Sequence, residues 1–430
     1  MRRALFAFLS SGVIQLAAVV TGLLAARLLG PGGRGALASV ISVTSVIAAV
    51  GLLSIGEATV FRTAGAPDDH QRDRILTASL ALAVILSIIT VMAGWMVDIL
   101  IFKGRSTLGD ALLFLSYVPL NHIGVVLVGS CQGRRSSVAW STLRATPQTV
   151  NAIACIYLLV SGQGGHVRNF LFVQLTGNGV LVCLASSYLL LQGFRFRSFS
   201  LATLRGLLSF GVRLHPAAVG TAAREHFDRI FMTIVLSAAA LGQYAVAATL
   251  AVSLMLIGGT VDMVAFPRIA GESDPEARRT LFLRFARVGI GLVAVTAVGL
   301  VTASPVLIPF LFGSAYSPAQ RIFPFLCLAY ALAASKVVLG AGLKAADHPL
   351  KLGGAEVVTL AMIALIMPPM ILAYGPIGAA VAACVAQGSS LVFLAYLAMR
   401  AYGARIGDIL MPRVGDMRFI ASRFARMMGW

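Results

Sequence analysis

The sequence predicts an all-α protein that crosses a membrane many times, and three observations lead to this prediction. Hydrophobic residues make up 58% of the 430 residues, and charged residues make up only 12%, about half of the share usual in soluble domains. The mean hydropathy is +0.90. The apolar residues come in runs close to the about 20 residues that a helix needs to cross a bilayer core. An ordinary soluble domain is therefore excluded.

Twelve apolar runs follow one another, separated by short segments rich in charge, Gly or Pro. They cover residues 5–29, 36–60, 75–101, 109–132, 138–160, 168–192, 206–236, 242–267, 284–311, 318–343, 353–374 and 376–400. Gly and Pro inside them are common in membrane helices, because neighbouring groups satisfy the freed backbone. The segment GPGGRG at 30–35 has the spacing of a dinucleotide motif, but it joins two apolar runs instead of a strand and a helix. It therefore predicts a tight turn.

The positions of Lys and Arg predict the orientation. Of the 34 Lys and Arg residues, 23 lie at the two ends of the chain and in every second loop, and the opposite loops carry only Arg34, Lys103, Arg105, Arg168 and Arg321. Because positive residues concentrate on the cytoplasmic side, both termini are expected in the cytoplasm of a bacterial plasma (inner) membrane protein. The net charge of +18 is explained by these loops and the tail, so we predict no nucleic-acid partner.

An internal repeat predicts two related halves. The segment EATVFRTAG begins at Glu57, DMVAFPRIAG begins at Asp262, and both close an even-numbered apolar run. Six runs in each half give both halves the same topology, as expected for repeats related by a pseudo-two-fold axis along the membrane normal. We therefore expect six-helix lobes at 1–192 and 206–402. A cytoplasmic interfacial linker at 193–205 would join them, and a basic cytoplasmic tail would follow at 403–430.

The seventh run contains an unusual cluster of charged residues. Arg213, Arg224, Glu225, Asp228 and Arg229 lie within it, although a charge at the bilayer centre costs at least about 2.5–3.5 kcal/mol. On a helix, residues eleven apart share a face, so Arg213 and Arg224 should align. Pairing between acids and bases would neutralise part of the cluster. Arg213 has no acid on its own helix nearby, which favours a cavity-lining role for at least one arginine.

Other ionisable residues also fall within the apolar runs. Arg27 lies near the outer end of the first run, and Lys336 lies too far from either end of the tenth to reach water, which favours a cavity or an acidic partner. The acids Glu57 and Asp262 occupy equivalent places in the repeat. They would either pair with loop arginines when the cytoplasmic side is closed or simply lie at the membrane interface.

No motif predicts chemistry. The five cysteines lie in or beside apolar runs without CxxC spacing, so neither disulfides nor a metal site is supported. No nucleophile motif and no long outer loop is present. We predict no catalytic residue, no cofactor and no bound metal.

Several motifs give the chain a resemblance to a known family. They are ARLLGPGGRGALA after the first run, LSFGVRLHP opening the seventh, FDRIFM with LGQYAVA around 227–247, LFGSAYSPA after the ninth and YGPIGAAVAA opening the twelfth. In this order and spacing, over nearly the whole chain, they resemble the polysaccharide and oligosaccharide-lipid flippases of the multidrug/oligosaccharidyl-lipid/polysaccharide superfamily. Arg27, Asp228 and Arg229 fall on the matching motifs, Arg213 lies inside one, and Arg224 lies outside them.

The resemblance implies a transport function. Two lobes would surround a central cavity and move an undecaprenyl-pyrophosphate-linked glycan from the cytoplasmic to the outer leaflet by alternating access. The lipid-linked glycan and membrane lipids would be partners, with a glycan polymerase and glycosyltransferases of the same pathway. The substrate-binding residues would be the basic ones, Arg27, Arg213, Arg224, Arg229 and Lys336. Gating or ion coupling would fall to the acids, Glu57, Glu225, Asp228 and Asp262.

Two alternatives stay open. A multidrug or cation efflux antiporter of the same superfamily would need an acidic cavity, whereas the embedded surplus here is basic and the first run carries no acid. A membrane-embedded glycan polymerase or ligase would be an enzyme and usually has a long outer loop with catalytic polar residues.

Overall fold

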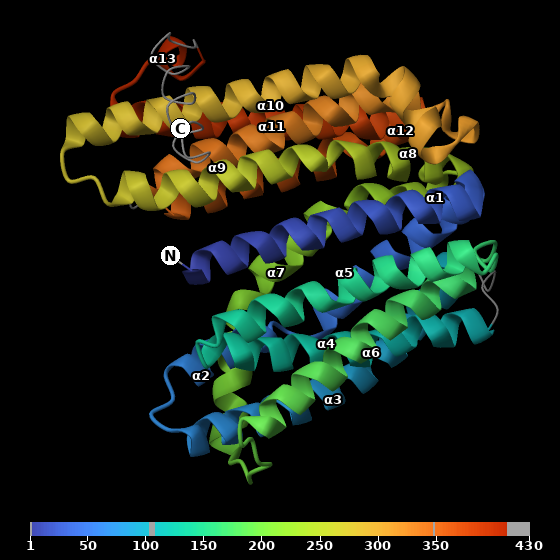
Figure 1. The fold of residues 1–430 in the computed structure, drawn as a ribbon, viewed down its shortest axis with the longest axis vertical. Coiled ribbons are helices and arrows are strands. Elements are labelled where there is room, and N and C mark those ends of the chain that lie inside the picture. The colour runs from blue at the N-terminus through green and yellow to red at the C-terminus, as the bar shows by residue number, and fades with distance from the viewer. Residues whose placement is uncertain (1, 103–107, 347–348, 411–430) are drawn as a thin grey trace. The chain divides into compact units, whose positions relative to one another are not determined.

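The computed structural model describes residues 2–102, 108–346 and 349–410. In these ranges every regular element is a helix (Figure 1), which confirms the predicted all-α class. The loop residues Lys103 and Arg105 and most of the predicted tail, 411–430, lie outside the described residues.

The helices follow the predicted apolar runs closely. In chain order they are α1 (Arg2–Gly51), α2 (Ile55–Ala64), α3 (Asp69–Phe102), α4 (Leu108–Gly133), α5 (Ser137–Val160), α6 (Val167–Leu191), α7 (Leu201–Val235), α8 (Ala238–Ala251), α9 (Ser253–Ala270), α10 (Pro275–Phe312), α11 (Ala319–Ala345), α12 (Pro349–Tyr402) and α13 (Ile406–Leu410), with a 3₁₀ turn, η1 (Ser314–Tyr316), between α10 and α11.

Two long helices are kinked at a Gly-Pro pair. Gly30 in α1 has φ 65° and ψ 179°, and Gly375 in α12 has φ 59° and ψ −138°. Glycine adopts this left-handed region without a Cβ clash, and the proline that follows each of them cannot continue a helical hydrogen bond. Each kink separates two of the predicted runs, so the turn expected near Gly30 is present as a kink.

The predicted run 36–60 is not one helix. Leu53 and Ser54 have positive φ values of 51° and 55°, which end α1 and start α2. A Cβ on Gly211 of α7 would overlap the carbonyl oxygen of Leu53. The irregular backbone is thus covered by protein, the condition under which it is tolerated at membrane depth.

Seven segments of the described chain are long and apolar enough to cross a membrane. They are Ser10–Gly51, Asp69–Met96, Val167–Leu191, Ala238–Ala270, Pro275–Phe312, Ala319–Ala345 and Leu352–Tyr402. The first and last, with 42 and 51 residues, contain the two kinks and exceed the length of two crossings of about 20 residues each. A multi-pass membrane protein is therefore indicated, and the count of twelve crossings stays a prediction.

The chain forms two compact units, Met1–Ala245 and Val246–Trp430, called unit 1 and unit 2 below. Unit 1 includes α7, which the sequence assigned to the second lobe, because α7 packs against α1, α2 and α3. Stacking of Phe61 on Phe210, with ring centroids 4.5 Å apart, is one of these contacts. The predicted lobe boundaries rest on the repeat and not on packing, and they stay a prediction.

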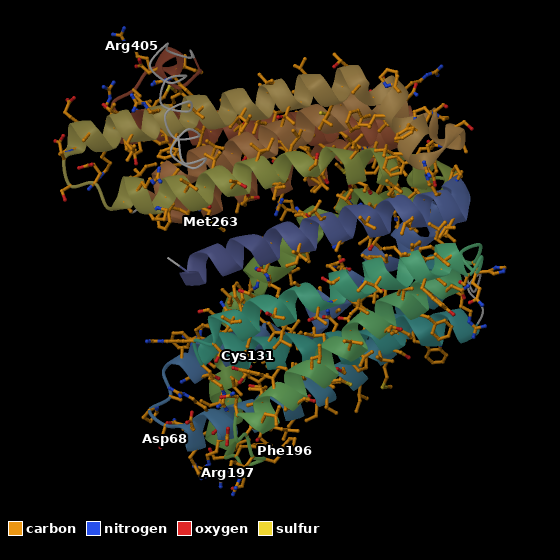
Figure 2. The ribbon with its side chains drawn as sticks, viewed as in Figure 1. Asp68, Cys131, Phe196, Arg197, Met263 and Arg405 are labelled. Carbon is orange, nitrogen blue, oxygen red and sulfur yellow. The ribbon has the colours of Figure 1, made fainter. Side chains whose placement is uncertain are left out.

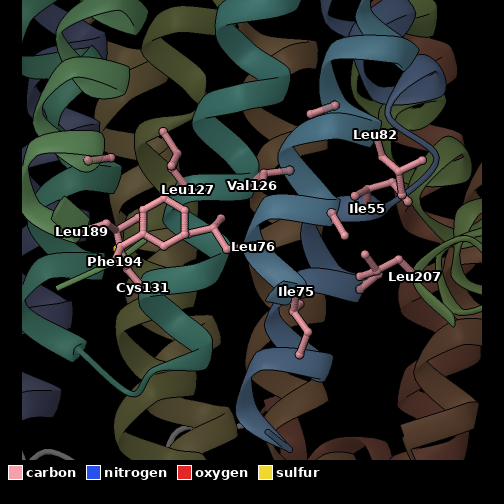
Figure 3. Close-up of a cluster of buried hydrophobic side chains, with 14 of the residues drawn as sticks. Ile55, Ile75, Leu76, Leu82, Val126, Leu127, Cys131, Leu189, Phe194 and Leu207 are labelled. Carbon is pink, nitrogen blue, oxygen red and sulfur yellow. The ribbon is translucent and has the colours of Figure 1, made fainter. Parts of the chain in front are cut away.

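One core of unit 1 joins α2, α3, α4, α6 and α7. Ile55, Leu76, Val126, Leu189 and Leu207 meet there with almost no exposed surface (Figure 3). In unit 2, α11 lies among α9, α10 and α12, and these helices share a second core. Each unit therefore has its own buried centre.

The turns predicted to be cytoplasmic meet at one end of unit 1. Asp73, near the start of α3, accepts a 2.7 Å hydrogen bond from Arg134 after α4 and a 3.1 Å bond from the backbone N–H of Arg195 after α6. Asp68 and Arg197 lie at this same end (Figure 2). The Asp73–Arg134 pair is nearly buried, with side chains 6% and 11% exposed. It joins three segments that the sequence places on one side of the membrane.

The backbones of α1 and α8 touch at two glycines. A Cβ on Gly35 would overlap the carbonyl oxygen of Ala238, and a Cβ on Gly242 would overlap that of Pro31. Small residues at a helix contact allow such close approach in membrane proteins. This contact brings together two of the motifs on which the family resemblance rests, ARLLGPGGRGALA and LGQYAVA.

We predict that Asp73→Asn destabilises the protein by about 3 kcal/mol. Without the Asp73 charge, the nearly buried Arg134 would keep only a 3.7 Å contact with the exposed Asp69, and a buried charge that loses its close partner is costly. Thermal unfolding of the purified protein in detergent measures the effect. Asp69→Asn is the matched control: Asp69 also pairs with Arg72 and Arg134 but is 76% exposed, and exposed pairs contribute less than about 1 kcal/mol. An equal loss of thermal stability in the two variants would contradict the role assigned to Asp73.

We also predict that Gly35→Ala lowers stability by about 1–3 kcal/mol or more, since an added methyl group in a filled contact forces backbones apart. Gly12→Ala on the same helix is the control, because a Cβ there meets nothing within 4 Å. Melting temperatures compared in the same detergent test this. A Gly35→Ala protein as stable as Gly12→Ala would mean that the α1–α8 contact does not hold unit 1 together.

Candidate functional site

The charged cluster predicted in the seventh run lies on a single helix. α7 runs from Leu201 to Val235 without interruption, although it contains Pro216. Its start is capped by the hydroxyl of Ser200, which accepts a hydrogen bond from the N–H of Thr203. Since α7 is continuous, Arg213 and Arg224 lie about three turns apart on one face, as predicted.

Arg213 is exposed and bonds only to its own helix. Its Nε donates a 2.8 Å hydrogen bond to the carbonyl oxygen of Ser209. Within the described ranges, no carboxylate lies within ion-pair distance of this guanidinium. Most of its donors therefore point away from the backbone, available to water or a ligand.

Arg224 lies next to an acid. Its guanidinium is 3.5 Å from the carboxylate of Glu225, and the two side chains are 29% and 55% exposed. At this distance and exposure the pair is weak. This contact joins two adjacent residues of α7.

Asp228 is held by a residue that the sequence reasoning missed. The hydroxyl of Tyr244 on α8 donates a 2.6 Å hydrogen bond to its Oδ2, and Tyr244 is only 2% exposed. A short bond from a buried hydroxyl to a carboxylate is strong, so it fixes α7 against α8. The signal was present in the sequence, because Tyr244 lies in LGQYAVA. Arg229 follows Asp228 and is partly buried.

Lys336 in unit 2 has the acidic partner that its depth suggested. The lysine is 6% exposed. Its Nζ donates to Oγ1 of Thr359 at 2.9 Å and to Oε1 of Gln387 at 3.0 Å, and lies 3.3 Å from Oε1 of Glu356. Three oxygens from α12 thus surround an ammonium on α11. The sequence reasoning missed all three partners, which appear there as isolated polar residues in apolar runs.

The repeat-related acids differ in their surroundings. Asp262 on α9 forms a 2.6 Å salt bridge with Lys344 at the end of α11, and the same ammonium lies 5.5 Å from the centre of the Phe266 ring. Glu57 on α2 is exposed and lines a polar cavity within unit 1. Asp262 therefore pairs with a lysine of a neighbouring helix, and pairing of either acid with loop arginines stays a prediction.

The predicted residues divide between the units. Arg27, which is exposed on α1, belongs to unit 1 together with Glu57 and the α7 cluster, whereas Asp262 and Lys336 belong to unit 2. Their convergence on one central cavity stays a prediction. Among the described residues, no three His, Cys, Asp or Glu side chains gather so that they could hold a metal ion.

The chain has a family match in sequence and several matches in structure. The model of the family described as "Polysaccharide biosynthesis protein" matches residues 24–321. No curated protein sequence matches the chain. The matched segment covers more than half of the chain and includes the α7 cluster.

Two solved structures illustrate the fold. The lipid II flippase MurJ in an inward closed conformation superposes with a TM-score of 0.74 at 13% identity, covering 94% of this chain and 89% of that one. An inward-facing multidrug resistance MATE family transporter of the MOP superfamily has a TM-score of 0.67 at 15% identity, covering 91% of this chain and 96% of that one. At such identities the likeness shows the fold alone.

These matches confirm the resemblance found in the motifs. Since the family model spans 24–321, and the helices take the fold shared by a lipid flippase and by drug transporters, the chain belongs to the polysaccharide biosynthesis protein family.

Proposed function

We propose that this protein is a flippase that moves a glycan linked to undecaprenyl pyrophosphate from the cytoplasmic to the outer leaflet. The observation that carries the proposal is Arg213, an exposed guanidinium on a continuous helix with no carboxylate partner among the described residues. Such a group is costly against lipid and is retained where it faces water or an anionic ligand.

A pyrophosphate fits this arrangement chemically. Its oxygens are acceptors that a guanidinium binds through two parallel N–H donors. Arg224 lies on the same face of α7, in a weak pair with the exposed Glu225, so a stronger anion can displace the carboxylate. Arg27 and Arg229 would add positive charge to a central cavity between the lobes, whereas Glu356 offsets the charge of the buried Lys336. The lobes would alternate access by rocking.

The remaining features of the proposal follow from this role. Both termini would lie in the cytoplasm of a bacterial inner membrane, and the protein would transport without catalysing a reaction. Glu57, Glu225, Asp228 and Asp262 would take part in gating or ion coupling. The glycan polymerase and glycosyltransferases of the same pathway would be partners.

A multidrug or cation efflux antiporter is the second candidate. The MATE-like fold favours it, as does the exposed carboxylate of Glu57 in a cavity of unit 1. Against it, Asp228 and Asp262 are already engaged by Tyr244 and Lys344. Fold alone does not decide between the two, since one fold serves many functions.

We predict that Arg224→Ala or Arg213→Ala weakens binding of glycan-free polyprenyl pyrophosphate by about ten- to hundredfold and blocks glycan export. One charge-assisted hydrogen bond contributes about 1.5–3 kcal/mol. Arg224→Lys should restore part of the pyrophosphate binding and part of the glycan export. Binding to the purified protein and the lipid-linked glycan pool of a complemented deletion strain give the two readouts. Arg168→Ala, an exposed arginine at the start of α6, is the control. Parental export by both alanine variants would favour the efflux function.

We predict cytoplasmic signals from reporters fused after Arg74 and Arg287 and an external signal after Gly313. In each unit the turns that carry the basic residues are expected on one side of the membrane. Paired alkaline phosphatase and fluorescent protein fusions measure the side. A consistent inversion of all three signals would overturn the proposed orientation and the direction of transport with it.

A further inference from the structure

Unit 1 contains an open cavity of about 380 Å³ lined by α2, α4, α5 and α6. Its wall includes five amide side chains, those of Asn121, Gln132, Gln148, Gln174 and Asn178. Gln148, Gln174 and Asn178 lie near the middle of their helices, within the apolar runs. Polar groups at such depth are retained where they line water or a ligand.

Several of the amides are held in place by the protein. The side chains of Asn151 and Gln174 hydrogen-bond to each other at 2.9 Å, and Asn178 donates to the backbone oxygen of Gln174 at 3.0 Å. Asn121 donates to the hydroxyl of Tyr117 at 3.2 Å. The wall is thus preorganised, which lowers the entropy lost when a ligand binds.

Two other amides are available to a ligand. Gln132 and Gln148 line the same cavity, and in the described part of the chain neither side chain has a hydrogen-bond partner. Each offers a carbonyl acceptor and an N–H₂ donor. The wall also carries one acid and one base, since Glu57 and Arg144 both line it. Arg144 is oriented by the hydroxyl of Ser11 at 2.8 Å and by the Trp140 ring at 4.7 Å.

This composition selects a neutral, hydroxyl-rich ligand. An amide and a hydroxyl are each donor and acceptor, so they pair in either direction. One acid, Glu57, and one base, Arg144, offset each other on the wall, so neither an anion nor a cation is favoured over a neutral ligand. The volume lies within the range of about 300–1,000 Å³ usual for small-ligand sites.

We propose that this cavity binds sugar units of the transported glycan, separately from the pyrophosphate, which the α7 arginines would bind. The inference rests on the proposed flippase function and deepens it by assigning the two chemical parts of the substrate to two sets of residues. Specificity for the glycan would then come from hydrogen bonds made by the amides, because a sugar whose hydroxyl groups do not match their donors and acceptors forms fewer of these bonds.

The test uses the full-length protein purified in detergent and two probes. One is the free oligosaccharide released by mild acid from the lipid-linked glycans of the host strain. The other is polyprenyl pyrophosphate without glycan. Calorimetric titration gives a Kd for each. We expect the Gln132→Leu/Gln148→Leu double variant to bind the oligosaccharide about ten- to hundredfold more weakly and to bind the pyrophosphate within about twofold of the parent.

Gln192→Leu is the matched control, because Gln192 is exposed after the end of α6 and outside the cavity wall. It should bind both probes like the parent, and the same melting temperature in all variants would show that folding is unchanged. The inference is overturned if the parent protein binds no oligosaccharide or if the double variant binds it like the parent. It is also overturned if the double variant loses affinity for both probes equally. Titration of the Arg224→Ala variant with the pyrophosphate tests the proposed function independently. Failure of the proposed function can therefore be distinguished from failure of the sugar-binding inference.

Discussion

The structure depends first on how an ionised side chain is accommodated in a protein whose surroundings are apolar. Lys336 is nearly buried, and three oxygens surround its ammonium. Asp73 is nearly buried, and it accepts hydrogen bonds from Arg134 and from a backbone N–H. Removing a charge from water is so costly that a buried ion persists only with such partners. The partners of Lys336 therefore hold α11 against α12 in unit 2, and the partners of Asp73 hold the start of α3 against the segments after α4 and α6 in unit 1.

Arg213 does not follow this pattern, and the difference gives α7 its functional interest. Its guanidinium bonds to its own backbone and otherwise has exposed donors. By contrast, Asp228 on the same helix is fixed by the buried Tyr244. The helix thus carries both Asp228, whose charge fixes α7 against α8, and Arg213, whose charge forms no ion pair among the described residues and is a candidate for binding an anion.

The comparisons place the fold among proteins that handle very different compounds. MurJ is a lipid II flippase, and the MATE proteins are multidrug transporters. Both share the helical arrangement of this chain at 13–15% identity. Substrate choice in such a fold comes from the polar side chains within it. In this chain the arginines of α7 and the amides around the cavity of unit 1 are chemically distinct, as are the pyrophosphate and sugar parts of a lipid-linked glycan.

The sequence by itself determined the helical class, most helix ends and the residues that needed an explanation. Apolar runs of membrane length can satisfy their backbone in lipid only as helices or closed barrels, and Gly-Pro pairs mark where runs such as 5–29 end. Depth alone also predicted a cavity or an acidic partner for Lys336. Only the tertiary structure decided that the partner is Glu356, that Tyr244 holds Asp228, that α7 packs with unit 1 and that five amides share one cavity. The reason is physical: periodicity and hydropathy act along one helix, whereas these contacts join helices far apart in the chain, and their geometry follows from packing.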